Sequence, residues 1–129
     1  MIILDTHIWI WWVEQSPQLT DKYQQLIEIH GKKGLGISII SCWEIAKLVE
    51  NQKIAFNLSI EEWLNKALAY QNVQLIDLSL PIIIQSTQLV NFHKDPADQL
   101  IVATAKVYNC PLLTADQKIL KYPHVQILS

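Results

Sequence analysis

Short apolar segments alternate with helix-forming segments along the chain, and this alternation constrains the fold more than any other feature of the sequence. Each short segment is apolar on both faces, which is typical of strands buried within a parallel sheet. The predicted strands are residues 2–4, 34–40, 73–78, 110–114 and 125–128, and the predicted helices are residues 7–16, 20–31, 41–52, 59–70, a segment after Pro81, 96–108 and 115–120. The pattern predicts an α/β fold, namely an α/β/α sandwich with a mostly parallel central sheet.

The length and composition favour one packed domain over residues 1–129, because 50% of the residues are hydrophobic and only 17% are charged. The N-terminal MIILDTH has no basic leader and does not resemble a signal peptide. The longest apolar runs, IWIWWV and SLPIII, are too short to cross a bilayer. Cys42 and Cys110 lack the spacing of a disulfide framework or a metal site. We therefore expect a cytoplasmic protein without a membrane partner.

The charge pattern argues against a protein that binds nucleic acid through a broad basic surface. The net charge is −2, and every basic residue is a lysine, so the chain contains no arginine. A local lysine patch, or phosphate binding through metal ions, stays compatible with this composition.

Acidic residues follow several of the predicted strands. Asp5 comes directly after the first strand, Glu44 falls in the first turn after the second, and Asp116 lies two residues after the segment 110–114. In parallel sheets the carboxyl ends of the strands meet at one edge, where sites commonly form. Each acid also has a local explanation as a helix cap, since Ser41 and Glu44 match a capping box and Thr114 could cap the helix that contains Asp116.

The stretch DPAD at residues 95–98 contains two aspartates for which we predict different roles. Asp95 is predicted to be the N-cap of the helix, with Pro96 at its first position. Asp98 instead shares a helical face with Ile101, Val102 and Ala105, the face expected to pack on the sheet. A partly buried carboxylate is costly unless it is paired with a cation. Convergence of Asp98 with the other acids would therefore favour binding of Mg²⁺ or Mn²⁺, which prefer oxygen ligands.

The sequence resembles the PIN-domain ribonucleases, and among them the VapC toxins of toxin–antitoxin pairs. The matching segments are IILDTHIWIWW, SIISCWEIAKLV, DPADQLIVATA and LLTADQKIL, which together run over essentially the whole chain. The resemblance implies a Mg²⁺- or Mn²⁺-dependent endoribonuclease that cleaves RNA, forms a homodimer and is neutralised by a small antitoxin packed against its early helices. It implies that the catalytic and metal-binding residues are Asp5, Glu44, Asp98 and Asp116, with supporting hydroxyls from Thr6 and Thr114.

The sequence departs from the family at one position beside these acids. Gln99 stands where the family very often has arginine, so the site lacks a cation that could contact RNA. Lys94 is the remaining candidate for a phosphate contact. Among Trp9, Trp11 and Trp12, a tryptophan at the surface would mark a partner contact.

Three other functions remain alternatives. The first is a catalytically inactive PIN-like module that only binds its partner, which the loss of arginine at Gln99 favours. The second is a structure-specific DNA nuclease of the same fold, for which 129 residues leave little room. The third is a phospho-accepting receiver-like domain, which would need a pair of acids at the first strand and a lysine after the last.

Overall fold

The computed structural model describes residues 1–129, and its centre is a small parallel sheet. The four strands have the order β3-β2-β1-β4, and all three neighbouring pairs are parallel. Ile3 lies at the middle of the sheet, in register with Gly36 on one side and Leu112 on the other. The strands are β1 (Ile2–Leu4), β2 (Leu35–Ser38), β3 (Val73–Ile76) and β4 (Leu112–Leu113).

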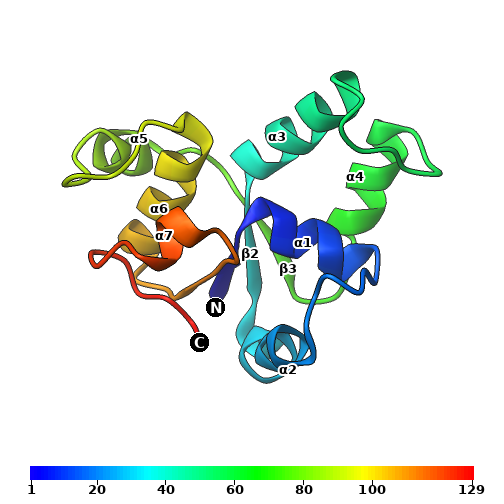
Figure 1. Cartoon of the computed structure of the whole chain (residues 1–129), viewed down its shortest axis with the longest axis horizontal. Helices are drawn as coiled ribbons and strands as arrows, with labels where there is room; N and C mark the ends of the chain where they lie inside the picture. The colour runs from blue at the N-terminus through cyan, green and yellow to red at the C-terminus, as the bar shows by residue number, and fades with distance from the viewer.

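Helices cover both faces of this sheet and confirm the predicted sandwich (Figure 1). The helices are α1 (Thr6–Val13), α2 (Asp21–His30), the 3-10 turn η1 (Gly31–Lys33), α3 (Ile39–Glu50), α4 (Ile60–Leu68), α5 (Leu80–Ser86), α6 (Pro96–Tyr108) and α7 (Gln117–Leu120). None of them is long and apolar enough to span a bilayer.

The alternation of side chains along β1 divides the interior into two cores. Ile2 and Leu4 face a core built with α1, α2, α3 and α4, around the buried Trp9. Ile3 faces the opposite core, which is built mainly with α5, α6 and α7 around Ile101. A strand residue points to the face opposite its neighbours, so a three-residue strand is enough to join the two cores.

Two predictions about strands are wrong. The segment 125–128 forms no strand, because Ile127 makes a single parallel bridge to Leu112 and the segment is held there by only two backbone hydrogen bonds. The prediction that every strand is apolar and buried on both faces also fails for β3, which lies at the edge of the sheet. Gln74 and Leu75 are exposed there, since no further strand and little helix cover them.

The boundary between β2 and α3 lies earlier than predicted. Ser38 ends the strand and caps α3 by accepting a hydrogen bond from the Ile40 N–H at 3.2 Å. The predicted capping box of Ser41 and Glu44 is therefore wrong, and both residues lie inside the helix. Other caps are as predicted: Ser59 and Glu62 form a capping box on α4, and Asp95 caps α6.

Candidate active site

Asp5 is held rigidly where β1 passes into α1. Its Oδ1 accepts a hydrogen bond from the Thr6 N–H at 2.8 Å, and its Oδ2 accepts one from the Thr114 hydroxyl at 2.6 Å. The residue is only 6% exposed. Burial raises the pKa of the Asp5 carboxyl, while the hydrogen bonds from Thr114 and Thr6 oppose that rise. A carboxylate at this position is oriented, but it lacks a full positive counter-charge.

Glu44 reaches the same edge of the sheet from α3. Its Oε1 lies 2.5 Å from the hydroxyl of Thr6, and that hydroxyl lies 2.9 Å from Oγ of Ser41. A threonine hydroxyl has one proton and can therefore donate only one hydrogen bond. Thr6 donates its hydrogen bond to Glu44 and accepts one from the Ser41 hydroxyl. Burial is the main cause that raises the pKa of Glu44. Lys47, three residues further along α3, pairs with Glu50 at 2.9 Å.

Asp98 lies in the first turn of α6 and faces inward. Its side chain is 14% exposed, and the residues that share its face, Ile101, Val102 and Ala105, are buried. This confirms the prediction that Asp98 heads the packed stripe of the helix. Burial raises the pKa of Asp98 to about 8, and repulsion from Asp5, Asp95, Asp116 and Glu44 adds to the rise.

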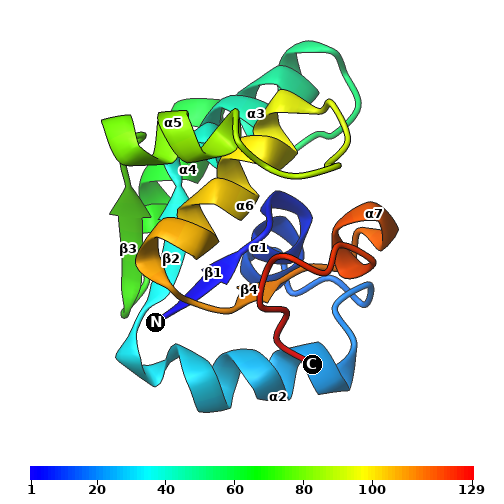
Figure 2. The same cartoon turned by 90° about the vertical axis from the view of Figure 1, so that its left-hand side faces the viewer.

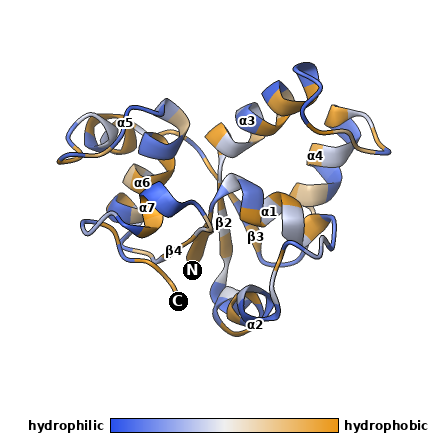
Figure 3. Cartoon of the chain, viewed as in Figure 1, coloured by the Kyte–Doolittle hydropathy of each residue, from blue (hydrophilic) through white to orange (hydrophobic).

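Asp116 follows β4 and caps α7. Its Oδ1 accepts hydrogen bonds from the N–H groups of Lys118 and Ile119 at 2.8 and 3.2 Å. The expectation that Thr114 would cap this helix is wrong. Instead the Thr114 hydroxyl accepts a hydrogen bond from the Asp116 N–H at 3.0 Å while it donates to Asp5. The start of α7 is hydrophilic, directly after the apolar β4 (Figure 3).

The four expected acids therefore lie at one end of the sheet: Asp5 and Asp116 directly precede α1 and α7, Glu44 lies within α3 and Asp98 within α6. In Figure 2 the strands lead toward the starts of α3, α1 and α7, and the first turn of α6 lies beside α3. Electrostatic repulsion acts between Asp5 and Asp116, and between Asp5 and Glu44, as well as on Asp98. Asp95 also raises the pKa of Glu44 and of Asp98. Asp95, predicted to be the helix cap, thus acts on these two acids in addition.

Two polar residues near Asp98 were not expected to take part. His93 Nε2 lies 3.2 Å from Asp98 Oδ2 but lacks the geometry of a hydrogen bond. Gln99 donates through its Nε2 to the His93 carbonyl at 3.0 Å and fixes the loop that precedes the helix. Lys94, between them, is exposed.

The donor set has the chemistry of a divalent cation site, although the side chains are not gathered around a single point. Carboxylates with neighbouring hydroxyls are the hard oxygen ligands that Mg²⁺ and Mn²⁺ prefer. No group of three or more acidic, histidine or cysteine side chains is close enough to hold one ion. The uncompensated charge around Asp98 fits a cation, and binding would require the acids to draw closer together.

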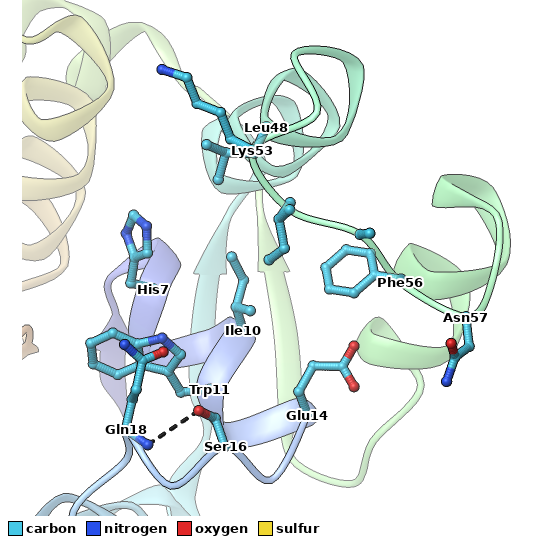
Figure 4. Close-up of a pocket in the computed structure, with 12 residues that line it drawn as sticks. His7, Ile10, Trp11, Glu14, Ser16, Gln18, Leu48, Lys53, Phe56 and Asn57 are labelled. Atoms are coloured by element: carbon cyan, nitrogen blue, oxygen red, sulfur yellow. Dashed lines mark hydrogen bonds between the residues drawn. The ribbon is translucent and has the colours of Figure 1, made fainter.

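Two neighbouring hollows lie beside α1, and the smaller one contains two of the acids. The smaller, of about 140 Å³, is lined by Asp5 and Asp116 together with His7, Trp11 and Ala115. His7 and Trp11 also line a larger pocket of about 570 Å³ between α1 and the segment 53–57. In this pocket Trp11 on α1 and Glu14 directly after it lie on one side, and Phe56 and Asn57 on the other (Figure 4). Trp11 and Trp12 are half-buried, whereas Trp9 is fully buried.

Comparison with known proteins gives a consistent result. The family model described as PIN domain matches residues 2–125. The protein Ribonuclease VapC22 of Mycobacterium tuberculosis (strain ATCC 25618 / H37Rv) is 29% identical over 124 residues, which cover 95% of this chain and 92% of that protein.

Solved structures share the fold at lower identity. VapBC2 from Rickettsia felis, bound to a DNA fragment from its promoter, matches with a TM-score of 0.71 and 22% identity, covering 99% of this chain and 98% of that one. A toxin–antitoxin complex from Klebsiella pneumoniae matches with a TM-score of 0.70 and 20% identity, covering 100% and 97%. FitAcB from Neisseria gonorrhoeae matches with a TM-score of 0.67 and 19% identity, covering 100% and 97%.

Proposed function

This chain belongs to the PIN-domain family, and on that premise we propose that it is an endoribonuclease and the toxin of a toxin–antitoxin pair. The similarity to Ribonuclease VapC22 over 95% of the chain supports this proposal. The observation that carries it is Asp98, a largely buried carboxyl that four other carboxyls repel. The one basic side chain within 4 Å of it is the imidazole of His93, at 3.2 Å. Such a concentration of like charge is unfavourable for a purely structural role and favourable for binding a cation.

The proposed cofactor is Mg²⁺ or Mn²⁺, held by Asp5, Glu44, Asp98 and Asp116. When bound, such an ion lowers the pKa of water and neutralises charge that develops on the phosphoryl group. The reaction is hydrolysis of a phosphodiester: a water oxygen forms a bond to phosphorus, one P–O bond of the RNA backbone breaks, and the leaving oxygen gains a proton. A carboxylate of the site accepts the proton that the water loses.

The threonines act on the acids and not on the substrate. Thr6 orients Glu44, and Thr114 orients Asp5 while it fixes the start of α7 beside Asp116. Hydrogen bonds to ligating carboxylates hold them in the geometry that a cation requires. Lys94, exposed at the start of α6, is the proposed phosphate contact.

The proposed protein partner is a small antitoxin. The pocket between α1 and the segment 53–57 is suited to hold part of it, because it combines the half-buried Trp11 with apolar side chains. It also shares His7 and Trp11 with the hollow that contains Asp5 and Asp116. We further propose a homodimer that acts on cytoplasmic RNA.

The test is cleavage of RNA oligonucleotides by the purified protein with Mn²⁺. The parent should cut, and Asp5→Asn and Asp98→Asn should each lower the rate by at least about 100-fold, as loss of groups that stabilise the transition state typically does. Equal cutting by parent and variants would contradict the proposal. Growth arrest on expression, relieved by the product of the adjacent gene, separates a toxin from an inactive PIN-like module that only binds its partner.

A further inference from the structure

A third hollow lies next to the acids on the side of α3 that faces the start of α6. Its volume is about 290 Å³. The α3 side is formed by Trp43, Glu44, Lys47 and Leu48, and the α6 side by Asp95, Pro96 and Ala97. Glu44 therefore belongs both to this hollow and to the acidic edge. A ligand in the hollow would therefore contact Glu44, which is also part of the proposed reaction centre.

Trp43 dominates the surface of this hollow. It is 55% exposed, although a tryptophan usually covers much of its large apolar surface. Its indole ring makes no aromatic contact within the protein. On the α6 side, Pro96 and Ala97 form an apolar wall. A flat group between these two walls would cover the indole.

The charges at the hollow restrict what that flat group can be. Glu44 and Asp95 flank it, and the charge of Lys47 is already paired with Glu50 at 2.9 Å. A phosphate inside the hollow would be repelled by both acids. Asp95 uses Oδ1 to accept from the N–H groups of Ala97 and Asp98, whereas its Oδ2 makes no hydrogen bond. The hollow thus offers an aromatic face and a free acceptor, which suit a neutral ring that carries N–H groups.

We propose that this hollow binds one nucleobase of a single-stranded RNA, stacked on Trp43, with its amino group donating to Asp95. Unstacked bases commonly pack on aromatic side chains, and this mode is typical of single-strand recognition. The inference rests on the proposed ribonuclease function and adds a subsite to it. Adenine, cytosine and guanine have an exocyclic amino group and uracil has none, so uracil is the base that the subsite disfavours.

The experiment uses heptanucleotide RNAs in which 2-aminopurine, a fluorescent base quenched by stacking, replaces one nucleotide at a time. The protein is the full chain with Asp98→Asn, which leaves the RNA uncut. One position should be strongly quenched on binding. Adding Trp43→Leu should abolish that quenching and weaken affinity on the order of 10-fold or more, whereas Trp43→Phe should retain most of both. Tyr108→Leu, an exposed aromatic at the far end of α6, is the matched control and should change neither.

The same variants separate failure of the subsite from failure of the proposed function. If the parent cuts RNA but Trp43→Leu leaves KM and the quenching unchanged, the subsite is wrong and the ribonuclease stands. If the parent does not cut but the quenching depends on Trp43, the subsite stands without the activity. If Trp43→Leu and Trp43→Phe behave alike, stacking is not the contact and the inference fails.

The exposed Trp43 could instead be covered by a second copy of the chain. Light scattering should give the same molar mass for the parent and for Trp43→Leu at equal concentration. A lower mass for the variant would mean that the face is covered by another copy, and would overturn the inference.

Discussion

The hydroxyl of Thr114 donates to Oδ2 of Asp5 at 2.6 Å, and so joins residues that are 109 positions apart in the sequence. The same hydroxyl accepts from the Asp116 N–H at 3.0 Å. One side chain thus links the ends of β1 and β4 and sets the positions of two acids. Because Asp5 is buried, no water can replace the hydroxyl without a rearrangement.

Replacing this hydroxyl should affect both stability and activity. Thr114→Val keeps the shape but leaves a buried carboxylate oxygen without its donor, which should lower the free energy of unfolding by about 1–3 kcal/mol in urea denaturation. RNA cleavage should fall as well, because Asp5 loses its orientation. Thr114→Ser keeps the hydroxyl and should restore most of both quantities. A valine variant as stable and active as the parent would show that the bond contributes little.

The acids should make the metal-free protein less stable as the pH rises. The pKa of Asp98 is raised from 3.8 to about 8, so between pH 4 and 8 the folded state binds more protons than the unfolded state. The free energy of unfolding therefore decreases with pH over that window, and the raised pKa values of Asp5 and Glu44 act in the same direction. With EDTA present, the Tm should be lower at pH 8 than at pH 5.5.

Asp98→Asn isolates that contribution. It removes the titrating carboxyl, so its Tm should fall less between pH 5.5 and pH 8 than that of the parent, and at pH 8 it should exceed the parent's. Glu28→Gln, at an exposed position of α2, is the control and should follow the parent. Identical pH profiles for the parent and Asp98→Asn would contradict the assigned repulsion.

A divalent cation should reverse the loss of stability. A ligand that binds only the folded state stabilises it by RT ln(1 + [L]/Kd), which is about 2.7 kcal/mol at 100 times Kd. Mn²⁺ at pH 8 should raise the Tm of the parent by several degrees and that of Asp98→Asn by much less. Glu28→Gln should respond as the parent does. A shift of equal size in all three proteins would indicate a nonspecific effect.

Local sequence signals were enough to predict α6 in full, because Asp95, Pro96 and the apolar face from Asp98 onward lie within one helix. Local signals failed to predict the start of α3, because two nearby serines both fit the role of N-cap. Ser38 and Ser41 could each cap α3, and the choice depends on where β2 stops pairing with β3. Ser41 is therefore free to contact Thr6.

Local sequence signals could not predict contacts between segments that are far apart in the chain. The Ser41–Thr6–Glu44 chain spans 35 and 38 positions and exists because α3 crosses the start of α1. His93 lies in an irregular loop, where no periodicity indicates direction, and it reaches Asp98 because Gln99 holds its carbonyl. Strand polarity predicted that Asp5, Glu44 and Asp116 would lie at one edge of the sheet, and the apolar face of α6 predicted that Asp98 would point inward. The hydrogen-bond partners of these acids could not be predicted in this way.

Gln99 gives a prediction about RNA affinity. Gln99→Arg would restore a cation beside Asp98 while still offering a donor to the His93 carbonyl. It should strengthen binding of single-stranded RNA and steepen the dependence of log K on log salt by about 0.7, the value for one added phosphate contact. Gln25→Arg, exposed on α2, should leave the slope nearly unchanged. An unchanged slope for Gln99→Arg would show that the side chain does not reach the RNA.

The wall of the large pocket should control antitoxin binding separately from catalysis. Phe56 stacks on the buried Trp63 with ring centroids 4.4 Å apart. Trp63 Nε1 in turn donates to Oε1 of Glu14, another residue of the pocket wall, at 3.1 Å. Phe56→Ala removes this wall, and aromatic pairs contribute about 0.5–1.5 kcal/mol beyond their buried area. Affinity for the adjacent gene product, measured by calorimetry, should fall about tenfold or more. The rate of RNA cleavage by the free protein should change less than about threefold, because Phe56 does not line the hollow that contains Asp5 and Asp116. Loss of cleavage together with binding would mean that the segment 53–57 shapes the catalytic edge instead.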